Sequence, residues 1–311
     1  LLVLRNPTIS NFPVGALLLE ELDGDQFVRV AHSILSSDGI ACEATGPDPL
    51  ASDIEMVYSM IQDHSGCDPF YGTGIRPRVP ELGPPLFDEP PRLTVSRRPI
   101  GPLSNVVDLG IEDGDVPSDP DFACLDTDQI GRPRIQDADL DERIRCDFGA
   151  IEQPPPVPFI VDHFTDDLDD AAPGDGVCAT NDVPGTGVVC TLRAAVMEAN
   201  ARPGLDHILF EPSTIPSVLT QLSSDSSSSA LPITETLAID GRLEAGRPAT
   251  TVEAQATGDR LFTIDAADED VYLRNLRLTG GDLSGSGRPG GAVSIGLDSR
   301  VRLLRSEVFD N

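Results

Sequence analysis

The sequence predicts a mainly β fold in which short strands form stacked coils. Segments 271–281 and 301–311 carry one spacing pattern twice, with Val271, Leu273, Leu276 and Leu278 aligned to Val301, Leu303, Ser306 and Val308. A unit with one apolar face cannot bury that face alone, so its repetition predicts coils stacked on one another. Segments 4–9 and 28–35 repeat this spacing near the other end of the chain, whereas the middle lacks it. The chain is therefore predicted to hold the end of one stack and the beginning of another.

Composition narrows the possible partners and the kind of core. The 311 residues include 52 acidic and 22 basic residues, a formal net charge of −30, and every basic residue is Arg. Such a charge makes nucleic acid and anionic lipid poor partners. Trp is absent and aromatic residues are few, so Leu, Ile, Val and Ala must form the core, which suits narrow coils. No apolar run approaches the roughly 18 residues of a membrane span. Residues 1–6 lack the charged start of a signal peptide, so any targeting segment is expected outside this sequence.

In the first half of the chain, a loop-rich region follows the predicted coils. Residues 1–37 predict two coils, and residues 38–152 predict a loop-rich region in which Pro, Gly and Asp dominate. Within it, residues 53–62 carry apolar side chains at helical spacing, which predicts a helix with one apolar face: Ile54, Val57, Met60 and Ile61. Residues 153–158, QPPPVP, predict a stiff, extended linker and the clearest boundary in the chain.

The second half predicts a strand, then a helix, then coils. Residues 159–164 read as a short strand followed by an acidic loop. Residues 191–201 predict a helix because Leu192, Ala195, Val196 and Ala199 form one apolar stripe, with Thr191 as N-cap. Strands are expected again at 207–210 and, before the repeat, at three further places: 237–239, 251–252 and 261–264. A helix just before the first coil is suited to cap the exposed end of the stack.

Six cysteines form three couples that are local in sequence. We predict the disulfides Cys42–Cys67, Cys124–Cys146 and Cys178–Cys190, one of fifteen possible connectivities. No Cys-x-x-Cys pair is present, which disfavours a zinc site or a redox motif. An even number of cysteines in loop regions favours an oxidising, extracytoplasmic compartment. Free buried thiols remain the alternative.

Several segments of the second half resemble a known domain. Cys190-Thr191-Leu192-Arg193-Ala194-Ala195 resembles the Cys-Ser-Leu-Arg-Glu-Ala signature of the CSLREA domain, with Thr for Ser and Ala for Glu. Residues 175–178, 198–201 and 203–208 extend this resemblance, and Gly290-Gly291-Ala292-Val293 is similar to a coil motif of polymorphic outer-membrane proteins. CSLREA domains stand at the start of parallel β-helix regions in bacterial and archaeal surface or secreted proteins.

The first half resembles a second group of proteins. Residues 128–134 (DQIGRPR) and 146–152 (CDFGAIE) are similar to the closing part of choice-of-anchor Q β-helix proteins. Together, the resemblances imply a right-handed parallel β-helix of the pectin-lyase-like class, an extracytoplasmic location and no assigned activity. On this basis, residues 1–152 are the C-terminal coils and loop-rich end of a first module. After the linker 153–158, residues 159–311 hold a CSLREA-type cap (159–210) and the first coils of a second module.

Two acidic clusters are candidates for Ca²⁺. Asp137, Asp139 and Asp141 present carboxylates at alternate positions, as calcium loops do, although Glu142 and Phe148 break the EF-hand pattern. A looser site there would also use Asp147 or Glu152. In the second cluster, like charges lie close together without a counter-ion: Asp166, Asp167, Asp169, Asp170 and Asp175. A solvated acidic loop is the simpler interpretation of each.

The favoured function is a non-enzymatic secreted or cell-surface protein, structural or adhesive, whose loops contact a surface or matrix ligand such as a polysaccharide or a protein. The alternative is a carbohydrate-active enzyme, either a polysaccharide lyase or a glycosidase. A glycosidase needs two carboxylates about 5–10 Å apart, for which the candidates are Asp265, Asp268, Glu269 and Asp270. A lyase would need a cation to acidify the α-proton of the sugar and a nearby base such as Arg274 or Arg277. A third possibility is a fragment of a longer repeat protein without activity of its own. No catalytic residue is assigned, and the four His residues are isolated in sequence.

Overall fold

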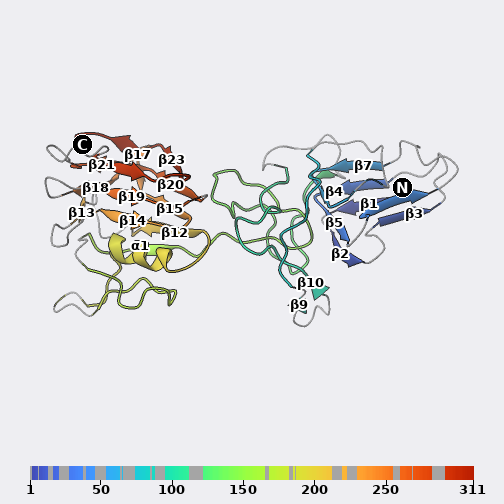
Figure 1. The fold of residues 1–311 in the computed structure, drawn as a ribbon, viewed down its shortest axis with the longest axis horizontal. Coiled ribbons are helices and arrows are strands. Elements are labelled where there is room, and N and C mark those ends of the chain that lie inside the picture. The colour runs from blue at the N-terminus through green and yellow to red at the C-terminus, as the bar shows by residue number, and fades with distance from the viewer. Residues whose placement is uncertain are drawn as a thin grey trace. The chain divides into compact units, whose positions relative to one another are not determined.

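The chain consists of two compact units, Leu1–Pro155 and Pro156–Asn311, and the boundary falls inside the Pro-rich segment 153–158. A computed structural model describes residues 2–5, 7–12, 17–20, 28–37, 40–45, 54–63, 65, 74–84, 86–87, 95–111, 122–164, 168–181, 185, 187–211, 219–222, 230–254, 260–267, 269–281 and 291–311. Each unit contains parallel strands stacked as a β-solenoid (Figure 1), so the predicted mainly β coil architecture is confirmed.

The first unit is a short stack of coils whose strands pair in parallel with the next coil. Its three parallel sheets are β1 (Leu2–Arg5), β4 (Val28–Ala31) and β7 (Ile54–Val57); β2 (Thr8–Phe12), β5 (Ile34–Ser37) and β8 (Met60–Ile61); and β3 (Leu17–Glu20) with β6 (Cys42–Thr45). A small antiparallel pair, β9 (Leu86–Phe87) and β10 (Val95–Ser96), lies farther along the chain. Turns and isolated bridges dominate residues 97–111 and 122–158, in agreement with the predicted loop-rich region.

The helix predicted at residues 53–62 is wrong, because this segment forms β7 and β8 of a third coil. Ile54 and Met56 are buried beside Val28 and Val30, their partners in the preceding coil. Tyr58, at φ 44°, turns the chain between the two strands. The inward side chains follow the two-residue period of a strand, and pairing with β4 supplies the backbone hydrogen bonds that a helix would otherwise form internally.

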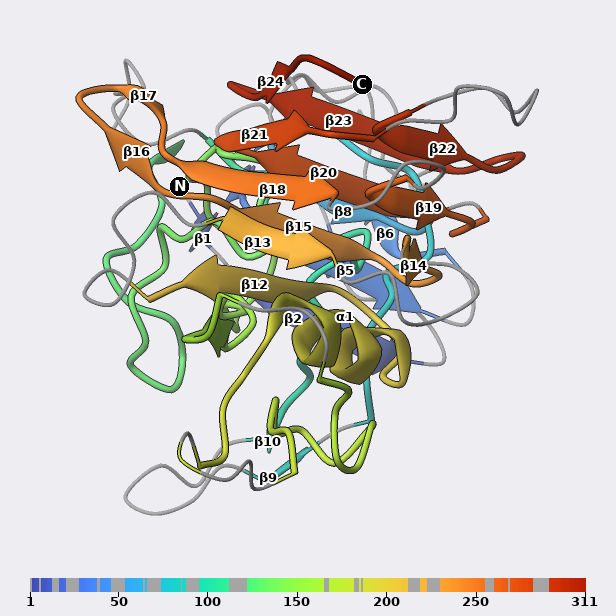
Figure 2. The ribbon, with the colours of Figure 1, turned by 90° about the vertical axis from the view of Figure 1, so that its left-hand side faces the viewer.

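The second unit is a longer solenoid of three parallel sheets, in which successive strands lie one above another (Figure 2). The first sheet contains β11 (Phe159–Val161), β12 (Asp206–Phe210), β15 (Leu237–Asp240), β20 (Asp270–Arg274) and β23 (Arg300–Leu304). The second contains β13 (Leu219–Leu222), β18 (Thr250–Ala254), β21 (Leu276–Thr279) and β24 (Glu307–Val308), and the third contains β14 (Leu231–Ile233), β19 (Phe262–Ile264) and β22 (Val293–Ile295). A hairpin of β16 (Leu243–Glu244) and β17 (Arg247–Pro248) interrupts one coil.

The register of this unit confirms the repeat seen in the sequence. Val271 and Leu273 pair with Val301 and Leu303, and Leu278 pairs with Val308. Val271 and Leu273 are fully buried in the aliphatic core, whereas Leu303, in the last described coil, is 46% exposed. The difference follows from stacking, since an inward side chain is covered only when a coil lies on each side of it.

The helix α1 (Leu192–Asn200) confirms the predicted helix and its N-cap. The Thr191 side chain accepts a hydrogen bond from the Ala194 N–H, and the stripe of Leu192, Ala195 and Val196 is buried. The helix packs against β11, β12 and β14 and lies below the first coils in Figure 1, where it covers the end of the stack. Among the described residues, no helix has the length and apolar character needed to cross a bilayer.

Candidate functional site

The two segments that resemble the closing part of choice-of-anchor Q proteins meet in the first unit. Asp128 accepts hydrogen bonds from the N–H groups of Ile130, Arg132 and Glu152. The buried Arg134 donates to the carbonyl oxygens of Asp147 and Gly149 at 2.8 and 2.7 Å. These bonds join residues 128–134 to residues 147–152. The residues of the two motifs therefore shape two loops and connect them.

Gly149 fixes this loop against the coils. It has a φ of 93°, and an added Cβ would lie 2.4 Å from Thr8 Oγ1 and 2.8 Å from Ile34 Cδ1. Its N–H donates to the His32 carbonyl oxygen, and the next N–H, of Ala150, donates to Thr8 Oγ1. Only glycine combines this backbone conformation with such a close approach. The buried loop therefore has a defined place against the first unit's solenoid.

Three buried carboxyl groups lie together behind this loop. Asp108, Asp147 and Glu152 each place one oxygen within 4.8 Å of the others, and their exposed fractions are 1%, 0% and 0%. The N–H of Asp108 donates to Asp147 Oδ1 at 2.9 Å, and the N–H of Asp147 donates to Glu152 Oε2 at 3.1 Å. Arg134 Nη2 lies 3.6 Å from Glu152 Oε2 and supplies one positive charge.

The electrostatic character of the cluster follows from this burial. Loss of solvation raises the pKa of Asp108 to about 8, and the neighbouring Asp147 and Asp139 charges add to the rise. Burial also raises the pKa values of Asp147 and Glu152 above their ordinary range, and Arg134 opposes both shifts. Burial disfavours a free carboxylate unless protons, cations or hydrogen bonds compensate its charge. The cluster is thus a site for protons or for a cation.

The predicted ligands Asp137, Asp139 and Asp141 lie in a loop beside this cluster. Asp137 and Asp139 each offer an oxygen within 4.8 Å of Asp108, whereas Asp141 is not part of that group. Asp141 instead pairs with Arg145 at 2.7 Å, and its other carboxylate oxygen accepts the N–H of Arg143. The structure brings two of the three together and adds Asp108, which the sequence analysis missed because nothing in residues 100–111 marks it.

The second predicted cluster is not assembled as a cation site among the described residues. Asp166 and Asp167 lie outside those residues, and Asp169 belongs to no described group with metal-ligand spacing. Asp170 accepts the N–H groups of Ala172 and Ala179, and Asp175 accepts that of Val177. These two side chains therefore shape the loop before the helix α1.

Two predicted disulfides are present. Cys124 is bonded to Cys146, and Cys178 to Cys190. Cys67 lies outside the described residues, so the pairing Cys42–Cys67 stays a prediction. His32 lies 3.5 Å from the Cys146 sulfur, but a disulfide has no thiolate to offer, so these residues do not form a zinc site.

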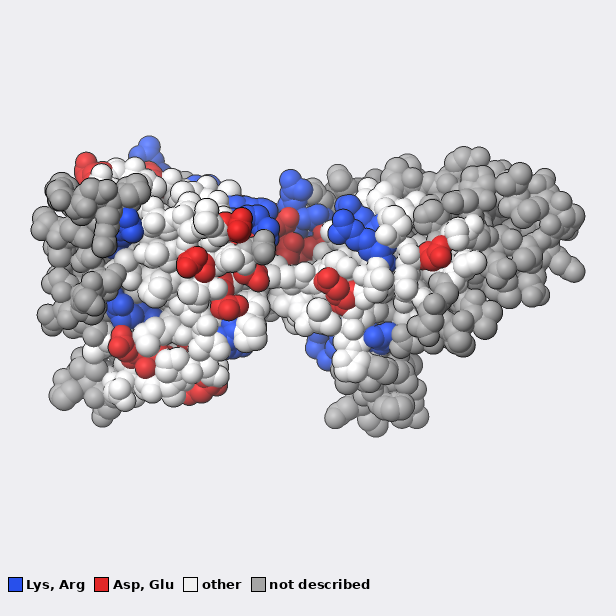
Figure 3. Space-filling model, viewed as in Figure 1, with Lys and Arg blue, Asp and Glu red and all other residues white. Residues whose placement is uncertain are grey.

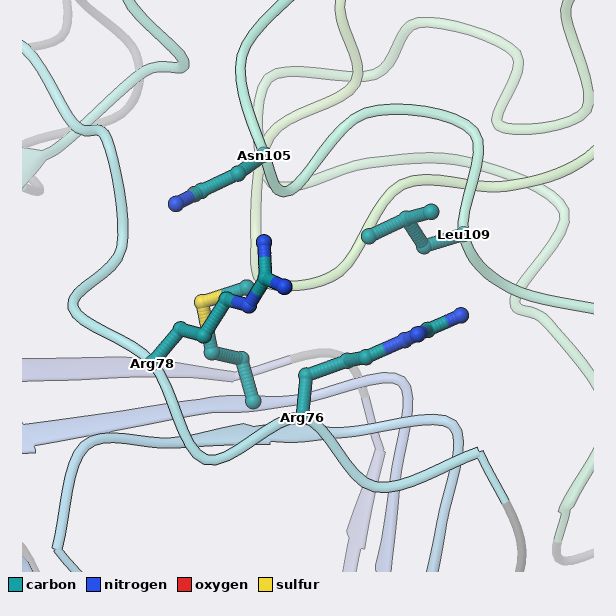
Figure 4. A pocket seen from close by; sticks show the side chains of 5 residues that line it. Arg76, Arg78, Asn105 and Leu109 are labelled. Carbon is teal, nitrogen blue, oxygen red and sulfur yellow. The ribbon is translucent and has the colours of Figure 1, made fainter.

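A separate pocket of the first unit carries positive charge. Its volume is about 210 Å³, and it is lined by Met60, Arg76, Arg78, Asn105 and Leu109. In Figure 4, the Arg78 side chain extends toward Asn105, and that of Arg76 lies beside Leu109. Both arginines are exposed, and within the described part of the chain neither guanidinium has a hydrogen bond or an ion pair. The pocket offers an apolar floor with two cationic groups.

The residues considered for catalysis in the second unit make contacts between coils. Arg277 pairs with Glu307, Asp270 pairs with Arg300, and the Thr236 hydroxyl donates to Glu269. Asp265 is exposed, and Asp268 lies outside the described residues.

One polar row on the first sheet of this unit was not predicted. His207 Nε2 lies 2.8 Å from Asp240 Oδ2, which Arg274 Nη1 approaches to 3.4 Å. The guanidinium groups of Arg274 and Arg302 stack over the Tyr272 ring at 4.8 and 5.3 Å. Tyr272 and Arg274 are only 4% and 3% exposed. The row therefore links successive coils by paired charges and by Arg side chains stacked on one Tyr ring.

Comparison with protein-family models, curated proteins and solved structures found no match to this chain. The β-solenoid is consistent with the parallel β-helix that the sequence resemblances imply, while membership of the CSLREA or choice-of-anchor Q families stays a prediction.

Proposed function

We propose that this chain is a non-enzymatic β-helix protein of an extracytoplasmic surface, with a structural or adhesive role. Its solenoids provide a rigid support from which loops project. Disulfides in the loop-rich parts of both units fit an oxidising compartment. On the face shown in Figure 3, acidic and Arg side chains of the described residues are interspersed, which suits a solvated surface with local contact sites.

One observation carries the choice of a non-enzymatic role. Arg274, Arg277 and Asp270, which the enzymatic hypothesis would use, already form ion pairs between neighbouring coils. A glycosidase needs two carboxylates placed on either side of a bound sugar, and a base must reach the substrate's proton. Side chains held by partners in the next coil are suited instead to stabilising the stack.

The ligand we propose is an acidic polysaccharide bound at the pocket of Arg76 and Arg78. Guanidinium groups bind carboxylate and sulfate through paired, charge-assisted hydrogen bonds. Met60 and Leu109 offer an apolar surface to the face of a sugar ring. The formal charge of −30 would repel such a polymer elsewhere, so binding would depend on this pocket and fall with increasing salt.

A second candidate function, a carbohydrate-active enzyme, is favoured by the row of His207, Asp240, Arg274 and Tyr272, since these side chains could transfer protons. The low exposure of Tyr272 and Arg274 argues against access by a polymer. The two functions differ in a simple observable, which is whether the polymer is cut.

The test uses polygalacturonate as the acidic probe and pullulan as the neutral one. We expect binding to polygalacturonate alone, measured by calorimetry, with no new reducing ends and no ultraviolet absorbance from unsaturated sugar products. The double variant Arg76→Ala/Arg78→Ala should weaken binding by about tenfold or more, since each charge-assisted contact contributes about 1.5–3 kcal/mol before screening. The control Arg247→Ala removes an exposed Arg on β17 and should bind as the natural chain does. Depolymerisation that is lost in His207→Ala would establish the enzyme instead.

A further inference from the structure

The carboxyl cluster of the first unit contains more negative charge than its described protein partners balance. Asp108, Asp147 and Glu152 would carry three negative charges when ionised, and Arg134 supplies one positive charge beside Glu152. The remaining two charges match one divalent cation. The exposed fraction of each carboxyl group is 1% or less, so bulk water does not solvate them.

Two oxygens of this cluster have no hydrogen-bond partner among the described residues. They are Asp108 Oδ1 and Glu152 Oε1, and both are inaccessible to solvent. The second oxygen of Asp108 accepts the N–H groups of Ala138 and Asp139 at 2.7 and 2.9 Å. Asp108 is thus held firmly by one oxygen while the other remains available. Buried polar atoms are nearly always paired, so two available oxygens in one acidic cluster point to a missing ligand.

We propose that Asp108, Asp147 and Glu152 bind a divalent cation, and that this cation is Ca²⁺. The donor atoms are all oxygen, which disfavours zinc and favours a hard cation. Asp137 and Asp139 each place an oxygen within 4.8 Å of Asp108, so two further carboxylates lie beside the three ligands. Ca²⁺ accepts six to eight oxygens in irregular geometry, whereas Mg²⁺ demands a near-ideal octahedron and retains water. A crowded, irregular group of buried carboxylates therefore favours Ca²⁺.

The position of the site gives the cation a structural role. Its three ligands come from two loops, at residue 108 and at residues 147–152, and the loop at residues 137–139 lies beside them. None of these loops contains a strand. The last loop contacts the solenoid through Gly149 and Ala150. Bound Ca²⁺ would hold these loops together against the coils, and the site does not depend on the function proposed above.

The first test measures Ca²⁺ itself on the whole chain. After treatment with chelator and dialysis, we expect one Ca²⁺ per chain to bind in calorimetry. Ca²⁺ at about 100 times its Kd should raise the melting midpoint by roughly 5–10 °C. Absence of stoichiometric binding, together with an unchanged midpoint, would mean that protons alone neutralise the cluster and would overturn the proposal.

The second test locates the ion with substitutions that conserve shape. Asp108→Asn and Glu152→Gln should each abolish stoichiometric binding, while the control Asp141→Asn, which changes a loop carboxylate paired with Arg145, should retain it. The opposite pattern would place the ion in the exposed loop and refute the buried site. If a variant does not fold, crystals of the natural chain soaked in a lanthanide decide the matter. An anomalous peak among the three buried carboxylates supports the proposal, and a peak elsewhere contradicts it.

Discussion

Glu198 of the helix α1 connects this helix to the loop that precedes it. The side chain is fully buried, and each carboxylate oxygen accepts one backbone hydrogen bond, from the N–H groups of Gly174 and Gly176. Glu198→Ala removes both acceptors and leaves the N–H groups of Gly174 and Gly176 without their helix partner. Glu198→Gln keeps the shape, but its NH₂ group must face one of the two N–H donors.

The loss in free energy of unfolding follows from the number of hydrogen bonds to Glu198 and from how far water can replace them. A hydrogen bond to a charged group contributes about 1.5–3 kcal/mol. Gly174 and Gly176 are exposed, so water can partly replace the lost acceptor, and the lower value applies to each bond. We therefore expect Glu198→Ala to reduce the free energy of unfolding of the second unit by about 3 kcal/mol. A loss of this size lowers the melting midpoint of a domain of this length by about 6–12 °C.

The assay is urea unfolding followed by circular dichroism, together with calorimetry to resolve the transitions of the two units. Glu244→Ala is the matched control, because Glu244 is an exposed residue of the β16–β17 hairpin. Glu198→Gln should behave much as Glu198→Ala does, since it also loses a bond and creates a contact between two donors. A stability of Glu198→Ala within about 1 kcal/mol of the control would refute the reasoning. So would full stability of the Gln variant.

Three further predictions test other parts of the structure. Replacing Cys178 and Cys190 together by Ser should lower the stability of the second unit by about 3 kcal/mol, as the release of a loop of this length implies, measured by urea unfolding. In the same measurement, Leu273→Ala should reduce the free energy of unfolding by about 3 kcal/mol, and Leu303→Ala should reduce it by about 1 kcal/mol. The two residues occupy paired positions, but only Leu273 is covered by a coil on each side. Burial lowers the pKa of His32 to about 4, so the unfolded chain takes up a proton before the folded one does. The stability due to neutral His32 is fully present above about pH 6.5 and falls by up to about 3 kcal/mol toward pH 4. The measurement is the free energy of unfolding as a function of pH, for the natural chain and for His32→Gln. If this free energy changes equally with pH in both chains, the prediction is wrong.

The coil architecture could be predicted wherever inward aliphatic residues recur at constant spacing. Val271 and Val301 are paired as the repeat implied, and the helix α1 begins after Thr191 as its capping pattern implied. The third coil of the first unit was missed for a physical reason. Its strands are short, and the corner at Tyr58 shifts the second strand, so that Ile54, Val57 and Met60 mimic helical spacing. Pairing with the preceding coil decides whether this segment forms strands or a helix. The sequence of the segment alone contains no information about that pairing.

The buried carboxyl cluster was predictable only in part. Carboxylates at alternate positions indicated a cation site at residues 137–141. Asp147 and Glu152 belong to the motif 146–152. Asp108 carries no local signal, yet it is the residue that two candidate ligand groups share. Its position depends on a φ of 50° and on bonds to residues about thirty positions away. Such a site depends on how loops fold against the coils, so only the folded chain reveals it.

The same logic explains why one contact between coils follows the spacing of the repeat and others do not. Arg277 and Glu307 are 30 residues apart, the spacing of the repeat that the aliphatic pattern also follows. Asp240 and Arg274 are 34 apart although they are register partners, because the loops of that coil are longer. His207 and Asp240 are 33 apart, because Asp240 lies two positions beyond Ala238, the register partner of His207. In a solenoid, the strands stack at constant distance while the loops between them vary freely. Register partners therefore keep a constant place within a coil but have a variable separation along the chain. A search that aligns strands first and then compares equivalent positions would have paired Asp240 with Arg274, whereas a search for a fixed spacing of 30 misses them. His207 lies opposite Ala238, so its contact with Asp240 is found only in the folded chain.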